Sequence, residues 1–204
     1  YDFLFASNMT LKNRVNDLPL ADDYYDYIII DEVHHVSASS YRPILNRFKP
    51  KILVGLTATP ERMDGEDILP DFCNAIAAEI RLPEALNQRL LCPFQYFGVS
   101  DNIDLSRVSW ENGKYNVAEL TRVYTESDER VRLIINALDR YLTDIHSVRA
   151  LCFCASIDHA KYMAMKFSLV GLKADVLLGD THDRTGIRKQ LERKEINYLF
   201  VVDV

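Results

Sequence analysis

The chain has 204 residues, of which 48% are hydrophobic, 26% charged and 10% aromatic, with only 7 glycines and 7 prolines. This composition is typical of a folded globular protein and excludes a disordered, collagen-like or fibrous chain. No run of about 18 apolar residues occurs and no signal peptide opens the chain, so we expect a cytoplasmic protein without a membrane partner. The net charge of −6 excludes a surface that is basic all over, but it permits local contacts with phosphates.

The four cysteines predict neither a metal site nor a disulfide framework. Cys152 and Cys154 alternate within an apolar run, so both face the same side of a predicted strand. The spacing is not C-x-x-C, and no second ligand pair follows at the distance of a zinc site. We therefore expect the cysteines to be reduced thiols in the core.

The first half of the chain alternates apolar strands with a helix. Residues 27–30 (YIII) end at Asp31, and residues 51–56 (KILVGL) end at the polar loop TATP. Between them, a helix is predicted from Ser39-Ser40 to about residue 48. Its apolar face consists of Tyr41, Ile44, Leu45 and Phe48. Continuous apolar strands joined by a helix indicate a parallel sheet covered on both faces, with ligands at the carboxyl ends of its strands.

The second half repeats this alternation. Its predicted elements are a helix opened by Pro83, a strand over 94–99, a polar connection over 100–114, a helix over 133–142, a strand over 150–155, a helix from Ser156 to Gly171, a strand over 174–178, the loop Gly179-Asp180-Thr181, a charged helix to about 193 and a strand over 198–202. The helix after Ser156 has one apolar face, made of Ile157, Ala160, Met163, Ala164 and Phe167. The fold class is therefore α/β, with parallel sheets flanked by helices.

Two adjacent carboxylates, Asp31 and Glu32, directly follow the first strand. Such a pair suits phosphoryl chemistry, because one carboxylate can hold Mg²⁺ while the next polarises the attacking water. A solvated acidic turn is the competing interpretation. A metal-dependent hydrolase that uses Asp31, His34 and His35 is a third alternative, although no H-E-x-x-H spacing supports it. The second strand delivers a threonine cluster to the same sheet edge, which favours the phosphoryl interpretation.

These motifs resemble those of superfamily 2 helicases and translocases of DExH type. The sequence DEVHH is similar to the Walker B motif, and LTATP is similar to motif III of that family. The runs GLTATPERMDGEDI and AEIRLPEALNQRLLCPFQYFGV resemble a bacterial DEAD/DEAH-box branch related to helicase subunits of restriction enzymes. The resemblance covers nearly the whole chain. It implies parts of two RecA-like lobes: residues 1–99 from the first lobe, a connection over 100–127, and residues 128–204 from the second.

The resemblance also implies roles at the nucleotide site. Asp31 would be the catalytic metal ligand for Mg²⁺, and Glu32 would activate the hydrolytic water. His34 would couple this site to Thr57 and Thr59.

A second group of residues would contact nucleic acid. The sequence FASNMTL is similar to motif Ib, which implies that Ser7 and Thr10 touch the nucleic-acid backbone. Ser156 lies in a strand–helix junction similar to motif IV, and Thr181 lies where the second lobe contacts the strand. Helix capping is the competing interpretation of Ser156 and Thr181.

Basic residues form two candidate phosphate surfaces, for which a solvated helix face is the alternative. One consists of Arg42, Arg47, Lys49 and Lys51; the other consists of Arg184, Arg188, Lys189, Arg193 and Lys194.

Several motifs of this helicase family do not occur in the sequence. No G-x-x-x-x-G-K-[ST] occurs, an arginine-bearing motif VI is not found, and residues 198–204 resemble only the start of motif V. We therefore expect a fragment of an ATP-dependent helicase that uses ATP, Mg²⁺ and nucleic acid, DNA rather than RNA, and we expect the isolated chain to be inactive. The alternative is a non-catalytic nucleic-acid-binding or scaffolding module. An exposed sheet edge would favour self-association or poor solubility.

Overall fold

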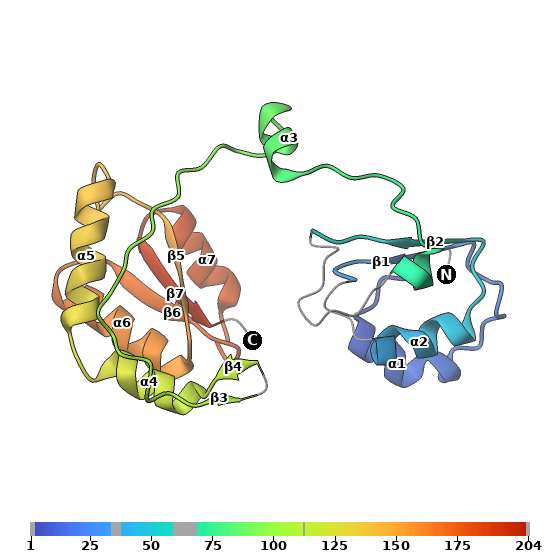
Figure 1. Cartoon of the computed structure of the whole chain (residues 1–204), viewed down its shortest axis with the longest axis horizontal. Helices are drawn as coiled ribbons and strands as arrows, with labels where there is room; N and C mark the ends of the chain where they lie inside the picture. Colours follow the sequence, from blue (N-terminus) through green and yellow to red (C-terminus); the bar gives the residue numbers. More distant parts are fainter. Residues whose placement is uncertain (1–2, 34–37, 59–68, 112, 203–204) are drawn as a thin grey trace. The chain divides into compact units, whose positions relative to one another are not determined.

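The computed structural model describes residues 3–33, 38–58, 69–111 and 113–202 (Figure 1). These residues form two compact units, which divide between Phe94 and Gln95. We call them the first unit and the second unit. In the described residues, no helix is long and apolar enough to cross a membrane.

The first unit is built around a pair of parallel strands. Its elements are α1 (Asn8–Arg14), η1 (Val15–Asp17), β1 (Tyr27–Ile30), α2 (Ala38–Arg47), β2 (Ile52–Gly55), η2 (Leu69–Phe72) and α3 (Leu82–Asn87). β1 and β2 pair in parallel, with Tyr27 opposite Ile52 and Ile30 opposite Gly55. Helices α1 and α2 lie on the same side of this pair (Figure 1). The predicted strands and the predicted intervening helix are confirmed.

The predicted apolar face of α2 packs into the core of the first unit. Ile44 and Phe48 are buried in one cluster with Val15, while Tyr41 is buried in a second cluster against which Leu45 is half-buried. Coverage of both sheet faces was the wrong prediction for this pair, however, because Tyr27 and Ile29 are each 63% exposed. Successive side chains of a strand point to opposite faces, and the described helices pack on only one of them.

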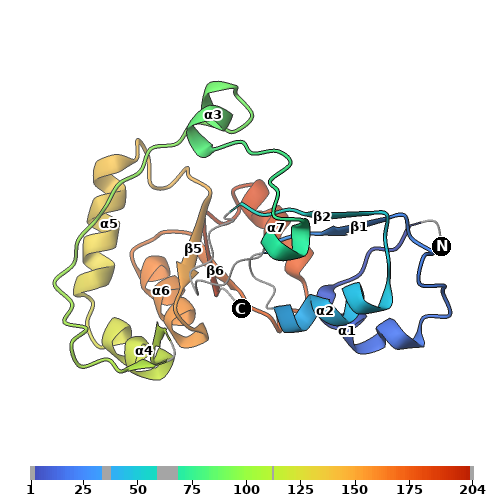
Figure 2. The same ribbon diagram turned by 45° about the vertical axis from the view of Figure 1, so that its right-hand side comes forward.

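The second unit contains a three-stranded parallel sheet. Its elements are β3 (Trp110–Glu111), β4 (Lys114–Tyr115), α4 (Val117–Thr125), α5 (Glu129–Tyr141), β5 (Ala150–Cys154), α6 (Ile157–Leu169), β6 (Ala174–Leu177), α7 (Arg184–Glu192) and β7 (Tyr198–Val202). The strand order is β5-β7-β6, with α5 and α6 on one face and α7 on the other (Figure 1, Figure 2). The fold is thus α/β with parallel sheets, as predicted.

The core of the second unit lies between α6 and β7. Phe167 of α6 makes edge-on ring contacts, each with a centroid distance of 5.1 Å, with Tyr198 and Phe200. Ala160, Met163, Ala164 and Phe167 are buried as predicted, but Ile157 is 47% exposed. Ile157 is the first residue of α6, so it precedes the turns that cover the sheet. Gly171 follows the helix with φ +83°, as expected for a helix terminator.

Two stretches, one at the end of the first predicted lobe and one in the predicted connection, differ from expectation. Residues 94–99 form no strand; instead, Phe97 stacks on Tyr141 of α5 at a centroid distance of 4.2 Å. Of the apolar residues that suggested a strand here, Phe97 packs against a helix, whereas Phe94 and Tyr96 are largely exposed. Residues 117–125, which fall within the predicted connection, form α4, and this helix packs against α6.

The cysteines fall into two classes. Cys152 and Cys154 are half-buried against the core of the second unit, and burial raises the pKa of Cys152 to about 12 and that of Cys154 to about 11. Both are therefore protonated thiols at neutral pH, as expected of core residues. Cys73 and Cys92 are exposed, contrary to the core prediction, because both lie in turns and extended segments outside the packed helices and strands. All four are free thiols.

Candidate functional site

The carboxyl ends of β1 and β2 meet at one sheet edge. The pairing continues beyond the last paired residues: the Leu56 N–H donates to the Ile30 carbonyl at 2.8 Å, and the Val33 N–H donates to the Leu56 carbonyl at 3.1 Å. Asp31 and Glu32 therefore lie in the loop that is tied at both ends to the segment leading into Thr57. The parallel register brings together the two polar clusters that are about 25 residues apart in the sequence.

The backbone turns sharply at Glu32. Its φ of +50° is in the left-handed region, which non-glycine residues seldom adopt. The Glu32 N–H donates to Asp31 Oδ1 at 3.0 Å, while the next residue, Val33, is buried. This turn places both carboxylates at the surface while Val33 enters the core. Backbone strain of this kind costs about 1–3 kcal/mol and clusters at functional sites.

A small cluster below the turn holds this loop in place. Val33 and Tyr41 are buried together, with Phe72 of η2 packed against them. The Tyr41 hydroxyl donates to Asp71 Oδ2 at 2.6 Å. Close packing of η2 on β2 requires a glycine, because a Cβ at Gly55 would lie 2.9 Å from the Phe72 ring. The acidic turn is therefore attached to a packed support.

Asp31 and Glu32 provide carboxylate oxygens, the kind of donor that Mg²⁺ prefers. Asp31 and Glu32 offer exposed carboxylate oxygens, and Thr57 is half-buried beside them. No group of three or more His, Cys, Asp or Glu that could hold a metal lies within the described ranges. Mg²⁺ is commonly held by one or two carboxylates together with water and substrate phosphates. His34, His35 and Thr59 lie outside the described residues.

Ser7 and Thr10 lie together at the start of α1. Ser7 caps the helix by accepting from the Thr10 N–H at 3.3 Å, and its hydroxyl donates to Thr10 Oγ1 at 2.8 Å. Both side chains are exposed. Because the two hydroxyl groups are close together and exposed, they are compatible with the predicted contact with the nucleic-acid backbone. The Ser7 oxygen, however, is already used in helix capping.

The side-chain oxygens of Ser156 and Thr181 both accept hydrogen bonds from nearby backbone N–H groups. Ser156 is the N-cap of α6 and accepts from the His159 N–H at 3.1 Å; it also accepts from Thr121 Oγ1 of α4 at 2.7 Å. The capping interpretation of Ser156 is therefore confirmed. Thr181 Oγ1 accepts from the Leu178 N–H at 2.9 Å and closes a turn. Capping by Thr181 was the wrong interpretation.

Asp183, rather than Thr181, caps α7. Its Oδ1 accepts from the Gly186 N–H at 2.7 Å. Gly186 permits this bond, because a Cβ there would lie 1.9 Å from the Asp183 carboxylate.

The basic residues of the first unit are already engaged. Lys49 donates to Asp22 at 2.8 Å and Lys51 to Asp26 at 2.6 Å. The hydrogen bond to Asp22 raises the pKa of Lys49, and that to Asp26 raises the pKa of Lys51. The Arg47 side chain donates to the Leu20 carbonyl. This surface is better described by the solvated-face interpretation.

Helix α7 presents a different basic surface. Arg184, Arg188 and Lys189 are exposed, and no carboxylate within the described part of the chain forms an ion pair with them. Arg193 lies 3.8 Å from Glu195. We call Arg184, Arg188 and Lys189 the α7 basic face.

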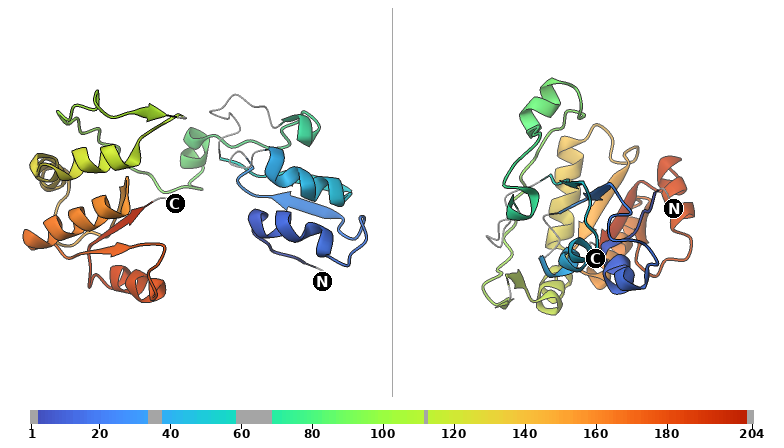
Figure 3. Two further views of the ribbon diagram at one scale, coloured as in Figure 1. Left: turned by 90° about the horizontal axis from the view of Figure 1, so that it is seen from below. Right: turned by 90° about the vertical axis from the view of Figure 1, so that its right-hand side faces the viewer.

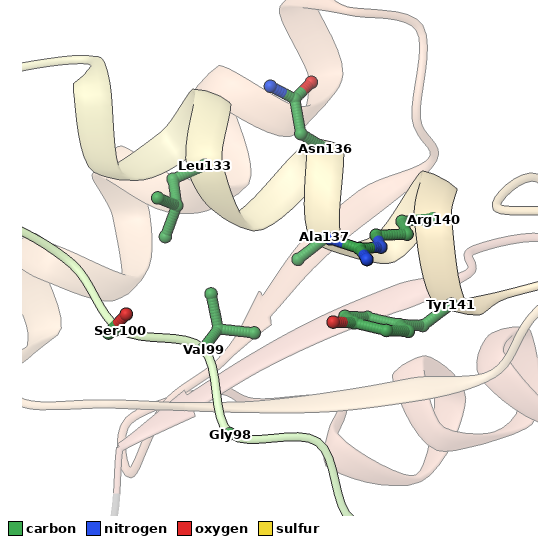
Figure 4. A pocket seen from close by; sticks show the side chains of 8 residues that line it. All are labelled: Gly98, Val99, Ser100, Leu133, Asn136, Ala137, Arg140 and Tyr141. Atoms are coloured by element: carbon green, nitrogen blue, oxygen red, sulfur yellow. The ribbon is translucent and has the colours of Figure 1, made fainter.

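A cavity of about 330 Å³ lies in the second unit. Val99 and Ser100 line one side, and Leu133, Ala137 and Tyr141 of α5 line the other (Figure 4). The chemistry-bearing residues do not line it, so we assign it no role in the site.

One exposed aromatic pair was not predicted from the sequence. Trp110 and Tyr115 lie opposite each other in the antiparallel β3–β4 hairpin. Their signal was available: the dipeptide Asn112-Gly113 between short polar-aromatic runs is typical of a hairpin.

Comparisons with known proteins agree with the motifs. Residues 1–62 match the family described as type III restriction enzyme, res subunit. The chain is 30% identical over 174 residues to the type I restriction enzyme EcoAI endonuclease subunit of Escherichia coli, an alignment that covers 76% of this chain and 21% of that protein. It is 27% identical over 201 residues to a proposed ATP-dependent helicase of Saccharomyces cerevisiae, IRC3, covering 96% of this chain and 28% of that protein.

A crystal structure of a DEAD-box protein from the hyperthermophile Methanococcus jannaschii is similar over 97% of this chain and 46% of that chain, with 18% identity. Its TM-score of 0.38 is too low to bear on function. The sequence matches confirm the resemblance to superfamily 2 helicases. The chain spans between a fifth and a third of the length of the two curated relatives described above.

Proposed function

We propose that this chain is part of an ATP-dependent nucleic-acid helicase or translocase, and that its first unit supplies the acidic and threonine motifs of the nucleotide site. The observation that supports this most directly is the parallel register of β1 and β2, which brings Asp31 and Glu32 beside Thr57. Adjacent polar groups at the carboxyl ends of parallel strands are the usual location of ligand sites in α/β folds.

The proposed roles follow from the exposed carboxylates. Asp31 would hold Mg²⁺, which when bound neutralises charge on the nucleotide phosphates. Glu32 would accept a hydrogen bond from the attacking water and take up its proton. Thr57, with His34 and Thr59, would link the state of this loop to the rest of the protein.

A nucleotide site needs phosphate-binding groups that this sequence does not contain. P-loop enzymes position the β- and γ-phosphates with a glycine-rich loop and its lysine, and an arginine finger contributes about 10³–10⁵ in rate. Accordingly, the 204-residue chain alone would not hydrolyse ATP, whereas a longer protein that contains it would do so when nucleic acid is added.

An ATPase assay on both forms tests this proposal. We expect hydrolysis that is stimulated by single-stranded DNA in the longer protein and no hydrolysis above background in the 204-residue chain. ATP turnover by the 204-residue chain would refute the proposal that this chain alone does not hydrolyse ATP. Nucleic-acid binding by the longer protein without any turnover would favour the alternative, a binding or scaffolding module.

The α7 basic face is the surface we propose for phosphate contacts in the second unit. Arg184 and Arg188 are four residues apart, so they lie on the same side of the helix. Each phosphate contact to a single strand changes the slope of log affinity against log salt by about 0.7. The double variant Arg184→Ala/Arg188→Ala should therefore weaken binding and reduce this slope by about 1.4.

The matched control is the double variant Lys49→Ala/Lys51→Ala. It removes the same charge, but from ammonium groups that already pair with Asp22 and Asp26. Its salt slope should equal that of the unchanged chain, and equal losses in both double variants would contradict a specific α7 surface. Competition between DNA and RNA oligonucleotides in the same assay tests the preference for DNA. The cytoplasmic location stays a prediction from sequence.

A further inference from the structure

A hydrogen bond beneath the acidic turn joins two elements whose residues are 30 positions apart in the sequence. The Tyr41 hydroxyl of α2 donates to Asp71 Oδ2 of η2 at 2.6 Å. Tyr41 is almost entirely buried, with 1% of its surface exposed, and the Asp71 side chain is 25% exposed. The left view of Figure 3 shows η2, drawn in teal, beside α2. The bond therefore fixes these two elements against each other.

The chemistry of this hydrogen bond makes it a strong one. A buried hydroxyl that loses its partner pays the cost of desolvation without compensation. The acceptor here is a carboxylate, and hydrogen bonds to ionised acceptors are shorter and stronger than those between neutral groups. The other carboxylate oxygen, Asp71 Oδ1, lies 4.0 Å from the Arg42 guanidinium. Asp71 thus contacts two consecutive residues of α2.

The contacts of Tyr41 lead from Asp71 to the acidic turn. Tyr41 and Val33 are buried in one cluster, with Phe72 packed against them. Val33 follows Glu32, where φ is +50°, and the Val33 N–H donates to the Leu56 carbonyl at 3.1 Å. Because interiors are closely packed, a shift of the Tyr41 ring moves Val33 and with it the backbone that carries the Glu32 carboxylate.

Asp71 is not a further metal ligand at this site. In the part of the chain that the structure describes, no three His, Cys, Asp or Glu side chains are grouped so that they could hold a metal ion. Asp71 therefore does not complete a cluster with Asp31 and Glu32. One of its oxygens already accepts from Tyr41. Any influence of Asp71 on the site passes through Tyr41 and Val33.

We propose that Asp71 is a positioning residue for ATP hydrolysis. By accepting the hydrogen bond from Tyr41, it holds the loop that orients Glu32 toward the attacking water. This inference rests on the proposed function, because it concerns the group that activates the water. Loss of the bond keeps the Glu32 carboxylate but lets its orientation vary. Turnover should therefore fall while the affinity for ATP is kept, because Glu32 acts on the water and not on the nucleotide.

Two substitutions break the hydrogen bond from its two sides. In a longer protein that contains this chain, Tyr41→Phe removes the donor and keeps the ring, and Asp71→Leu removes the acceptor. Each should lower kcat for DNA-stimulated ATP hydrolysis about 10- to 100-fold, the loss expected when a reacting group is misplaced by up to about 1 Å, with KM for ATP unchanged. Asp71→Asn keeps an acceptor oxygen and should restore kcat to within about 5-fold of the unchanged protein.

The second unit offers a matched control. The Tyr162 hydroxyl donates to Asp128 Oδ1 at 2.5 Å, so Tyr162→Phe removes the same atom from the same kind of hydrogen bond away from the acidic turn. This variant should leave kcat and KM unchanged. Equal losses of kcat in Tyr41→Phe and Tyr162→Phe would contradict a role tied to the acidic turn.

Combination with Glu32→Gln separates positioning from general damage to the fold. If Asp71 acts through Glu32, Asp71→Leu should cause no further loss of turnover in a protein that already carries Glu32→Gln, because the group that it orients is gone. If Asp71 only supports the fold, the same substitution lowers turnover by the same factor in both backgrounds, and the positioning proposal is wrong. Titration with a non-hydrolysable ATP analogue gives the fraction of competent sites, to which each rate is normalised.

The outcomes distinguish this inference from the proposed function. Slow turnover in Glu32→Gln together with full turnover in Asp71→Leu would overturn the positioning role and leave the proposed function standing. Full turnover in Glu32→Gln would overturn both. A loss of ATP affinity as large as the loss of kcat in Asp71→Leu would also overturn the positioning role, because the residue would then support nucleotide binding. If Asp71→Leu does not fold, Tyr41→Phe, alone and with Glu32→Gln, gives the same test.

Discussion

Close packing at Gly55 gives a quantitative test of the support beneath the acidic turn. A Cβ added at Gly55 would lie 2.9 Å from both Cε1 and Cζ of Phe72 and 3.3 Å from its Cε2. Carbon atoms in good contact are about 3.5–4.0 Å apart. The variant Gly55→Ala therefore forces the Phe72 ring to move by several tenths of an ångström.

The Phe72 ring cannot move freely, because it packs against Val33 and Tyr41. Tyr41 is in turn hydrogen-bonded to Asp71, the residue before Phe72. Overpacking of this kind costs about 1–3 kcal/mol. Alanine is more favourable than glycine inside a strand by about 0.5–1 kcal/mol, which offsets part of the cost. Taking the middle of each range, the net expectation is a loss of about 1 kcal/mol in the stability of the first unit.

Amide hydrogen exchange at Leu56 measures this loss, because its N–H donates to Ile30 at the sheet edge. Exchange should be about 5-fold faster in Gly55→Ala. The double variant Gly55→Ala/Phe72→Leu, with a smaller side chain opposite, should recover most of the protection. Gly98→Ala is the control, because a Cβ there meets nothing within 4 Å. Unchanged or slower exchange in Gly55→Ala would refute the packing of η2 on β2.

Two further predictions concern the second unit. Ser156→Ala should lower its free energy of unfolding by about 1 kcal/mol through loss of the α6 cap, and thermal denaturation measures this; a loss of nucleic-acid affinity without a loss of stability would contradict a mainly structural role. His159 is buried, and desolvation lowers its pKa from 6.5 to about 4, so the unfolded chain binds a proton first as the pH falls. Stability should therefore fall between pH 6.5 and about 4. The urea midpoint, followed by Trp110 fluorescence at pH 7 and pH 5, should shift, and His159→Gln should remove most of this shift; equal midpoints in the unchanged chain would contradict the buried neutral imidazole.

Sequence alone predicted the sheet edge well because its cause is local. A strand of apolar residues that ends at Asp31 and another that ends at Thr57 must present their polar ends together if they pair in parallel, and they do. The predicted strand over 94–99 was wrong because apolar content does not distinguish pairing with a strand from packing on a helix. Phe97 finds its partner, Tyr141, over forty residues later.

Contacts between distant residues also limited the prediction of binding surfaces. Lys49 and Lys51 pair with Asp22 and Asp26, more than twenty residues earlier, and no local pattern reveals this. The α6 cap was predictable from Ser156 at a strand–helix boundary, whereas its second partner, Thr121, is in another helix. The candidate site was therefore predictable from residues that are neighbours in the sequence. Which basic residues are free to contact phosphates depends instead on ion pairs between residues far apart in the sequence.

We propose that Glu32 activates water for ATP hydrolysis beside Asp31. The most direct measurement is the rate of DNA-stimulated ATP hydrolysis in a longer protein that contains this chain, comparing Glu32→Gln with the exposed-helix control Glu129→Gln. We expect Glu32→Gln to lower the turnover number by about 10²–10⁴ while ATP binding is kept, and we expect Glu129→Gln to leave both unchanged. Full turnover in Glu32→Gln, or equal losses in both variants, would contradict this role for the acidic turn.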